Sequence, residues 1–229
     1  MVRQRDGAHH FLWALVDSAR KPGAFTTSGI MRFMRNIVIL ISGSGSNMIA
    51  LAKTCERDQW PIKFGASICA VICNRPHAEG LSAARNMGLI TQVVDHQAFA
   101  GQADPRAAFD QALIQAIDVH QPCLVVLAGF MRILTPAFVA HYAGRLINIH
   151  PSLLPAFPGL NTHQRVLDAG CQFTGASVHA VTADLDHGPI LAQAVVPVLP
   201  GDTADTLRQR VLSQEHLLYP KTVANWLMR

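Results

Sequence analysis

The stretch Asn36-Ile37-Val38-Ile39-Leu40-Ile41-Ser42 decides the fold of this chain. Its five central residues are all aliphatic, with no polar residue at alternate positions. A continuous aliphatic run of this kind is typical of a parallel strand that is covered on both faces. We therefore expect residues 36–42 to form the first core strand of an α/β fold.

The sequence that follows alternates between helical and strand patterns. Residues 47–58 carry apolar side chains at helical spacing (Met48, Leu51, Ala52 and Cys55). Further strands are predicted at 67–73, 90–94, 124–128, 145–150, 176–182 and 190–198, and helices at 78–87, 105–120, 162–169, from 203, and after a Thr135-Pro136 cap. Strand–helix alternation indicates right-handed crossovers and a parallel sheet. We expect a single three-layer α/β domain over residues 35–229, with a mostly parallel twisted sheet of about seven strands.

Composition favours a well-packed core and gives no reason to expect nucleic-acid binding. Half of the 229 residues are hydrophobic and 15% are charged, a balance that supports a sizeable buried core. Residues 1–34 contain five basic and two acidic side chains, a net charge of +3 out of the total of +4. The remainder carries about +1, so any attraction for an anion has to be local.

The N-terminal residues 1–34 are interpreted as a flexible extension. Their apolar patch at residues 11–16 is too short for a signal peptide, and no run in the chain approaches the ~20 residues that cross a bilayer. Met31 and Met34 precede the first core strand, so a start at either one is an alternative to Met1 that the sequence leaves open. The five cysteines are scattered at spacings that fit no zinc pattern, so we expect reduced thiols, no metal and a cytoplasmic protein.

A glycine-rich turn, Ser42-Gly43-Ser44-Gly45-Ser46-Asn47, follows the first strand. In parallel sheets ligands bind beyond the carboxyl ends of the strands, and the N–H groups of a helix start attract anions. A helix cap by Ser46 or Asn47 is the simpler structural interpretation, and both can hold together. Met48 stands where a dinucleotide fingerprint has its third glycine, and a Walker lysine is absent. The turn therefore fits a phosphate monoester better than a dinucleotide.

A second polar cluster is predicted at the end of the strand over residues 145–150. Side chains two positions apart on a strand share a face, so Asn148 and His150 point the same way. Asp186 is a carboxylate further along the chain. An amide donor, an imidazole and a carboxylate together suit acyl transfer, because they stabilise an oxyanion and move a proton.

Three separated motifs resemble the folate-dependent formyltransferases. They are Asn148-Ile149-His150-Pro151-Ser152-Leu153-Leu154-Pro155-Ala156-Phe157-Pro158-Gly159, Gly175-Ala176-Ser177-Val178-His179 and Leu185-Asp186-His187-Gly188-Pro189. The resemblance runs from about residue 36 to the C-terminus and implies a Rossmann-like formyltransferase fold. It also implies transfer of the formyl group from 10-formyltetrahydrofolate, as co-substrate, to the amine of N1-(5-phosphoribosyl)glycinamide in purine (IMP) synthesis, without a metal.

The resemblance also implies roles for particular residues. The expected catalytic residues are Asn148, His150 and Asp186, with Ser177 and His179 bracing them. The expected nucleotide-substrate contacts are Gly45, Ser46, Asn47 and Glu215, and the expected folate contacts are Arg106, Met131, Arg132, Ile133, Leu134 and Asn148. For Arg106, an exposed cation at a helix start is an equally good interpretation. The Leu154-Pro155 bond is expected to be cis, as in relatives, and His187 departs from the Leu-Asp-Gly-Gly-Pro pattern of many relatives.

Two other functions remain open at this stage. One is formyltetrahydrofolate deformylase, a hydrolase, although those enzymes carry an additional N-terminal domain for which residues 1–34 are too short. The other is a non-catalytic phosphate-ligand-binding module, which does not explain the set formed by Asn148, His150 and Asp186. A tRNA-formylating relative would need a further C-terminal domain and a basic surface. Expected partners are small molecules, without nucleic acid or membrane, for a monomer or weak homodimer.

Overall fold

A computed structural model describes residues 34–229, so the expectations for residues 1–33 lie outside it. Its core is a seven-stranded sheet in the order β3-β2-β1-β4-β5-β6-β7. The strands are β1 (Arg35–Ile41), β2 (Ala66–Cys73), β3 (Ile90–Val93), β4 (Pro122–Leu127), β5 (Leu146–His150), β6 (Phe173–Ala180) and β7 (Ile190–Pro197). The first five are parallel, whereas β6 is antiparallel to both β5 and β7. The prediction of a mostly parallel sheet of about seven strands is confirmed.

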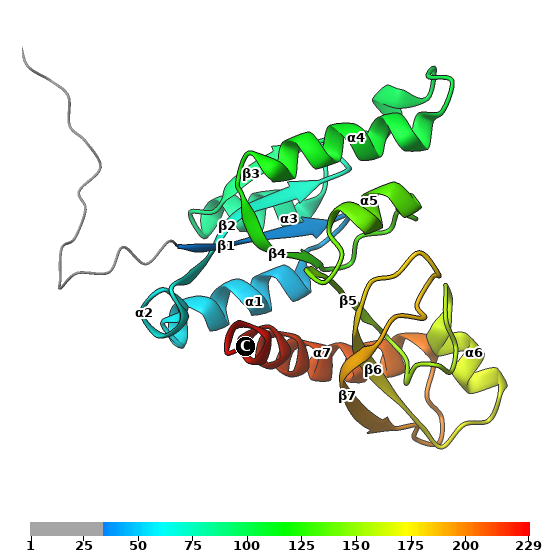
Figure 1. The fold of residues 1–229 in the computed structure, drawn as a ribbon. Coiled ribbons are helices and arrows are strands. Elements are labelled where there is room, and N and C mark those ends of the chain that lie inside the picture. Colours follow the sequence, from blue (N-terminus) through cyan, green and yellow to red (C-terminus); the bar gives the residue numbers. More distant parts are fainter. Residues whose placement is uncertain (1–33) are drawn as a thin grey trace, which may run out of the picture. The chain divides into compact units, whose positions relative to one another are not determined.

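Helices cover both faces of the sheet and make three layers (Figure 1). The helices are α1 (Ser46–Arg57), α2 (Trp60–Phe64), α3 (Glu79–Asn86), α4 (Pro105–Asp118), α5 (Pro136–His141), α6 (Thr162–Asp168) and α7 (Ala204–Leu227), with a 3₁₀ turn η1 (His96–Phe99). One core cluster joins α1, α3 and α7 to the sheet, and the other joins α4 and α5. Strand β1 contributes Ile37, Ile39 and Ile41 to the first cluster and Val38 and Leu40 to the second. This division explains why the strand is continuously aliphatic.

The observed elements follow the predicted ones, although most boundaries shift by one or two residues and three differences are larger. The short helix α2 and the turn η1 were not predicted, because neither is long enough to show a helical period. Strand β6 begins at Phe173, three residues before the predicted start at 176, and includes Gly175. That glycine is required in the strand, since a Cβ there would lie 1.8 Å from the Ala194 carbonyl oxygen on β7. The predicted Thr135 cap is present, and its hydroxyl accepts from the Phe138 N–H.

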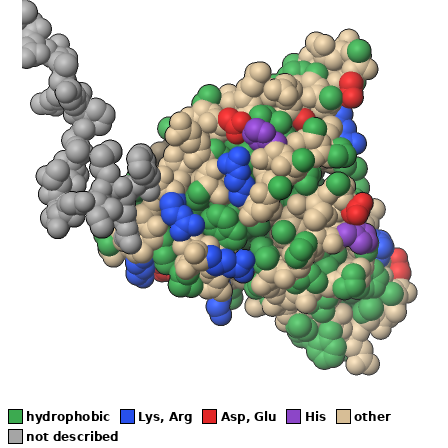
Figure 2. Space-filling model, in the orientation of Figure 1, with side chains coloured by type: hydrophobic (Ala, Val, Ile, Leu, Met, Phe, Trp, Pro, Cys, Tyr) green, Lys and Arg blue, Asp and Glu red, His purple; other side chains and the backbone are tan. Residues whose placement is uncertain are grey.

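The surface of the described chain carries no strong electrostatic bias on the face shown in Figure 2, where basic, acidic and hydrophobic side chains are interspersed. None of the helices within residues 34–229 combines the length and apolar composition needed to cross a bilayer. All five cysteines are free thiols.

Candidate active site

The end of β5 carries two of the predicted catalytic side chains. Asn148 pairs across the sheet with His179 on β6, and His150 pairs with Ser177. The Asn148 Nδ2 atom lies 3.2 Å from His179 Nε2. His150 is almost entirely buried. The antiparallel pairing of β5 with β6 therefore brings Ser177 and His179 beside the predicted catalytic residues, as the motif resemblance implied.

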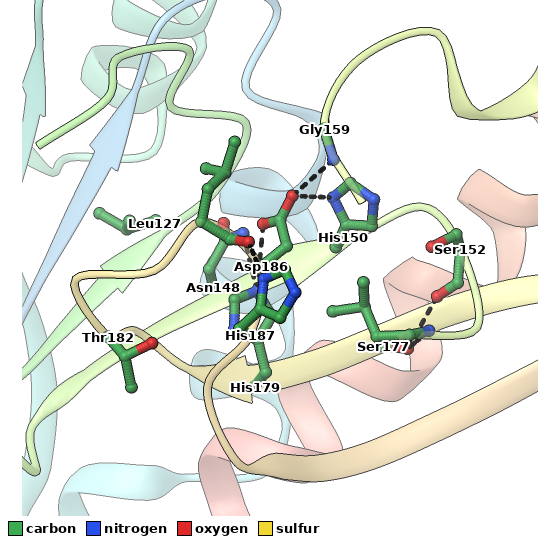
Figure 3. Close-up of polar contacts among 12 residues, drawn as sticks. Leu127, Asn148, His150, Ser152, Gly159, Ser177, His179, Thr182, Asp186 and His187 are labelled. Carbon is green, nitrogen blue, oxygen red and sulfur yellow. Dashed lines mark hydrogen bonds and ion pairs between the residues drawn. The ribbon is translucent and has the colours of Figure 1, made fainter. Parts of the chain in front are cut away.

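Asp186 lies in the loop between β6 and β7, and its side chain reaches both histidines (Figure 3). Its Oδ2 atom is 3.3 Å from His150 Nδ1 and accepts a 2.9 Å hydrogen bond from the Gly159 N–H. Its Oδ1 atom is 3.6 Å from His179 Nε2. The structure thus brings Asn148, His150 and Asp186 together from strand β5 and a loop 36 residues after His150.

Backbone carbonyl oxygens determine which nitrogen of each imidazole carries a proton. His150 Nε2 is 2.9 Å from the Phe157 oxygen, and His179 Nδ1 is 2.9 Å from the Ala180 oxygen. A carbonyl oxygen can only accept, so both of these nitrogens donate. In a neutral His179, Nε2 is then an acceptor, which requires the Asn148 amide to present its NH2 group. Burial lowers the pKa of His179, opposed by the Ala180 hydrogen bond and by Asp186, which favours this neutral form.

The loop that carries Asp186 departs from the expected glycine pattern at only one position. His187 is exposed, and its Nδ1 donates to the Leu185 carbonyl oxygen. Gly188 has no room for a side chain, because a Cβ there would lie 1.7 Å from the Ala180 oxygen. Position 188, where only a glycine fits, is therefore occupied by glycine.

A cavity of about 1150 Å³ opens beside these residues and contains the predicted folate loop. Its wall includes Asn148, His150 and Asp186 together with the whole segment Met131, Arg132, Ile133 and Leu134. Four hydrophobic side chains around it are more than half exposed: Met131, Ile133, Leu160 and Leu185. Exposed apolar side chains that gather round a cavity mark a ligand-binding surface.

Arg106 holds the segment over residues 131–134, the predicted folate loop, in place. Its guanidinium donates to the Ile133 and Leu134 carbonyl oxygens, and it also lines the cavity. Asp110, one turn further along α4, accepts a 2.6 Å hydrogen bond from the Thr135 N–H. The loop is therefore clamped at two points by α4. Arg106 is also exposed at the start of α4, so the structure contains both of its predicted features, an exposed cation at a helix start and a position beside the cavity.

The glycine-rich turn lies outside the lining of this cavity and leaves the start of α1 without a side-chain cap. The N-cap residue is Gly45, with a φ of 73°, so the expected cap by Ser46 or Asn47 is wrong. Asn47 instead donates from Nδ2 to Glu215 Oε2 at 2.6 Å, which joins the turn to α7. The first N–H groups of α1 are left without side-chain partners, as an anion site at a helix start requires.

Glu215 is a buried carboxyl group, 7% exposed. Burial raises its pKa, and the hydrogen bond from Asn47 lowers it to a smaller extent. The amide oxygen of Asn47, Oδ1, is buried and has no hydrogen-bond partner within residues 34–229. Sequence patterns alone could not find this pair, because its members are 168 residues apart.

Ser42 connects the two predicted substrate regions. Its hydroxyl donates to Asn74 Oδ1 at 2.6 Å and accepts from the Met131 N–H at 2.8 Å. Its backbone N–H donates to the Gly129 oxygen at 3.2 Å. The end of β1 therefore places the glycine-rich turn next to the predicted folate loop.

Several features of the site were not predicted. The Gly159 N–H and the Phe157 oxygen act through the backbone, so no side-chain pattern signals them. His163 lines the cavity, and its pKa is lowered by burial and by the charges of Arg208 and His150.

The Leu154-Pro155 bond is cis, which confirms that prediction. Across the described part of the chain, no three His, Cys, Asp or Glu side chains are grouped in a way that could hold a metal ion.

Comparison with known proteins identifies the class to which this fold and site belong. Residues 35–223 match the formyl transferase family, and the chain belongs to it. The chain is 50% identical over 189 residues to the phosphoribosylglycinamide formyltransferase of Escherichia coli (strain K12), which covers 82% of this chain and 85% of that protein. It is 43% identical over 187 residues to the trifunctional purine biosynthetic protein adenosine-3 of Bos taurus, which covers 82% of this chain and 18% of that protein.

A solved structure gives the same result for the fold. The phosphoribosylglycinamide formyltransferase from Brucella melitensis has a TM-score of 0.76 and 49% sequence identity, covering 85% of this chain and 96% of that chain. The resemblance to formyltransferases found in the sequence is confirmed.

Proposed function

We propose that this protein transfers the formyl group of 10-formyltetrahydrofolate to the amine of N1-(5-phosphoribosyl)glycinamide, a step of purine synthesis. The observation that carries the proposal is the convergence of Asn148, His150 and Asp186 at one wall of a cavity of about 1150 Å³. Typical small-molecule sites have roughly 300–1,000 Å³. A cavity larger than this range suits a substrate as large as a folate.

The proposed chemistry begins with attack of the neutral amine on the formyl carbon. A C–N bond forms, the carbonyl oxygen becomes an oxyanion, and preorganised donors lower the barrier by stabilising it. Asn148 presents its NH2 group, because neutral His179 accepts one of its hydrogens, and the other remains for the oxyanion. His150 donates through Nδ1 when it is protonated, since Nε2 is already bonded to the Phe157 oxygen.

Asp186 has two functions in this proposal. Its charge, 3.3 Å from His150 Nδ1, stabilises the imidazolium that faces the oxyanion. It also accepts the proton that the amine loses, directly or through water. Collapse of the intermediate breaks the bond from carbon to N10, and that proton ends on N10 of tetrahydrofolate. The Gly159 N–H holds the carboxylate in position during these steps.

The substrates are assigned to the two regions joined by Ser42. The pterin ring is assigned to the segment Met131, Arg132, Ile133 and Leu134, whose position is fixed by Arg106. The phosphate–ribose end of the nucleotide is assigned to Gly45, Ser46 and Asn47, with Glu215 nearby. The uncapped start of α1 supports this second assignment, because its free N–H groups suit a phosphate. A metal has no part in this scheme, and the reaction is assigned to the cytoplasm.

Hydrolysis of 10-formyltetrahydrofolate by water is the alternative reaction at the same residues. The glycine-rich turn with its Asn47–Glu215 pair favours transfer, since a hydrolase needs no nucleotide site. The test is an assay that follows both tetrahydrofolate release and formylglycinamide ribonucleotide formation, with and without the amine substrate. Stoichiometric product formation that depends on the amine is expected. Equal tetrahydrofolate release without the amine would identify a hydrolase.

A further inference from the structure

Three polar side chains form a row across strands β5, β6 and β7. His150 pairs with Ser177, and Ser177 pairs with Gln193. Gln193 is exposed and does not line the cavity. Its amide nevertheless turns inward, because Nε2 donates to the Leu154 oxygen and to Ser177 Oγ, both at 2.9 Å.

The Ser177 hydroxyl uses its full hydrogen-bonding capacity at this point. It donates to the Ser152 oxygen at 2.7 Å and accepts from the Leu154 N–H at 2.9 Å, in addition to the bond from Gln193. Figure 3 shows Ser177 and Ser152 facing each other below His150. Gln193 and Ser177 therefore hold both sides of the peptide chain at Ser152 and Leu154, in the loop that follows β5.

The same loop returns to His150 five residues after Ser152. The Ser152 hydroxyl donates to the Ala156 oxygen at 2.6 Å and approaches the Phe157 oxygen at 3.3 Å. The Phe157 oxygen is the acceptor for His150 Nε2. Hydrogen bonds, continued through the covalent chain of Ser152, thus link Gln193 to the loop that carries the Phe157 oxygen. That oxygen fixes the proton on His150 Nε2 and turns Nδ1 toward Asp186.

We propose that Gln193 is a positioning residue for His150, which acts through Ser177 and the loop over residues 152–157. It keeps the imidazole in the orientation in which Nδ1 faces Asp186 Oδ2. The effect on turnover rests on the proposed formyl transfer, whereas the effect on the imidazole does not. Because Gln193 touches no part of the cavity, its loss is expected to lower kcat and to leave both KM values nearly unchanged.

The test is the Gln193→Met variant, which has a similar shape, adds no charge and lacks the donor. A matched control is Gln92→Met, since Gln92 is an exposed strand glutamine at the opposite edge of the sheet. A misplacement of about 1 Å can cost on the order of 10²-fold in rate, so a fall of about tenfold in kcat is expected for a loosened loop. Gln193→Lys keeps a hydrogen-bond donor, and its kcat is expected to be at least half of the wild-type value.

A second readout follows His150 directly by ¹⁵N NMR, with its signals assigned by their absence in His150→Gln. The wild type should place the proton of neutral His150 on Nε2, and Gln193→Met should broaden or shift that signal while Gln92→Met does not. A wild-type proton on Nδ1, an unchanged signal in Gln193→Met, or a kcat within twofold of wild type would overturn the proposal. If the wild type hydrolyses formyl-folate instead of transferring its formyl group, the proposed function fails, and the NMR result still decides the positioning role.

Discussion

Asp186→Asn is the substitution that isolates the charge of the carboxylate from its geometry. The Gly159 N–H at 2.9 Å requires an acceptor at the Oδ2 position, so the new amide must place its oxygen there. Its NH2 group then occupies the Oδ1 position, 3.6 Å from His179 Nε2. The Asp186 side chain is 6% exposed, and the substitution by asparagine preserves its shape. The folded structure is therefore expected to survive while the charge is lost.

The size of the effect follows from the distance to His150. Two unit charges separated by 3.3 Å interact by about 5 kcal/mol at an effective dielectric constant of ~20. One decade in rate corresponds to about 1.4 kcal/mol, so full loss of this term equals between three and four decades. Because the oxyanion develops only in the transition state, the loss of this charge interaction should appear in kcat rather than in KM. We expect kcat to fall by about 10³-fold.

The assay compares initial rates of formyl transfer with saturating nucleotide and folate, and thermal unfolding reports on the fold. Asp184→Asn is the matched control, because Asp184 is an exposed carboxylate in the same loop. That variant should keep wild-type kcat. A loss of less than tenfold in Asp186→Asn, with the fold intact, would refute the assignment of the Asp186 charge to the transition state.

Four further predictions follow from the site. Asn148→Ala should lower kcat by 10²–10³-fold, the order seen when one oxyanion donor is removed, and a near-normal kcat in initial-rate assays would contradict its role. Burial raises the pKa of Glu215. A carboxyl group whose pKa is higher in the folded than in the unfolded state stabilises the fold at low pH, and this contribution is lost as pH rises from the unfolded-state pKa through the folded-state pKa. Glu215→Gln should therefore flatten the dependence of melting temperature on pH in that range, and it should raise KM for the nucleotide, as a pH series of melting curves and steady-state kinetics will show. Arg106→Ala should raise KM for formyl-folate several-fold without changing nucleotide KM, because the carbonyl groups of the folate loop lose their clamp. Removal of residues 1–33 should leave melting temperature and kcat unchanged, since the family match begins at residue 35.

The glycine-rich turn shows which substitutions can test the nucleotide site. Gly45→Val would add a side chain at a φ of 73°, and its Cβ would lie 3.0 Å from Gly80 Cα. Such a residue is strained regardless of any ligand, so this variant would report on folding as much as on phosphate binding. Glu215→Gln is the sharper probe, because it keeps an oxygen that can accept from Asn47.

The sequence allowed the fold to be predicted because the strands that build its centre are buried on both faces. A short, continuous aliphatic run such as 37–41 is typical of a strand that is buried on both faces, so β1 could be identified from residue type alone. The side chains of Asn148 and His150 could be predicted to share a face for a similar reason, since the strand period is fixed. The helix α2 was missed because five residues show no periodicity, although its Trp60 is fully buried.

Contacts between distant residues were beyond reach of any local pattern. Glu215 stands in an ordinary helical sequence, and only the packing of α7 against α1 reveals its hydrogen bond to Asn47. Gln193 is an exposed glutamine in an edge strand, which sequence reasoning treats as solvated. Backbone acceptors such as the Phe157 oxygen leave no trace in a side-chain pattern, yet this oxygen determines which nitrogen of His150 faces Asp186.

The histidine at position 187 shows how the loop geometry separates required from free positions. In the loop between β6 and β7, the positive φ falls on Asp186, at 57°, and not on His187 or Gly188. An aspartate tolerates this left-handed conformation better than most residues. Glycine is required at 188 for a different reason, because the Ala180 oxygen occupies the space of a Cβ. His187 has neither constraint and is exposed, so it can replace a glycine without moving the carboxylate beside it. The position of Asp186 is therefore determined by its own backbone conformation and by Gly188, which is why the site survives this departure from the pattern of its relatives.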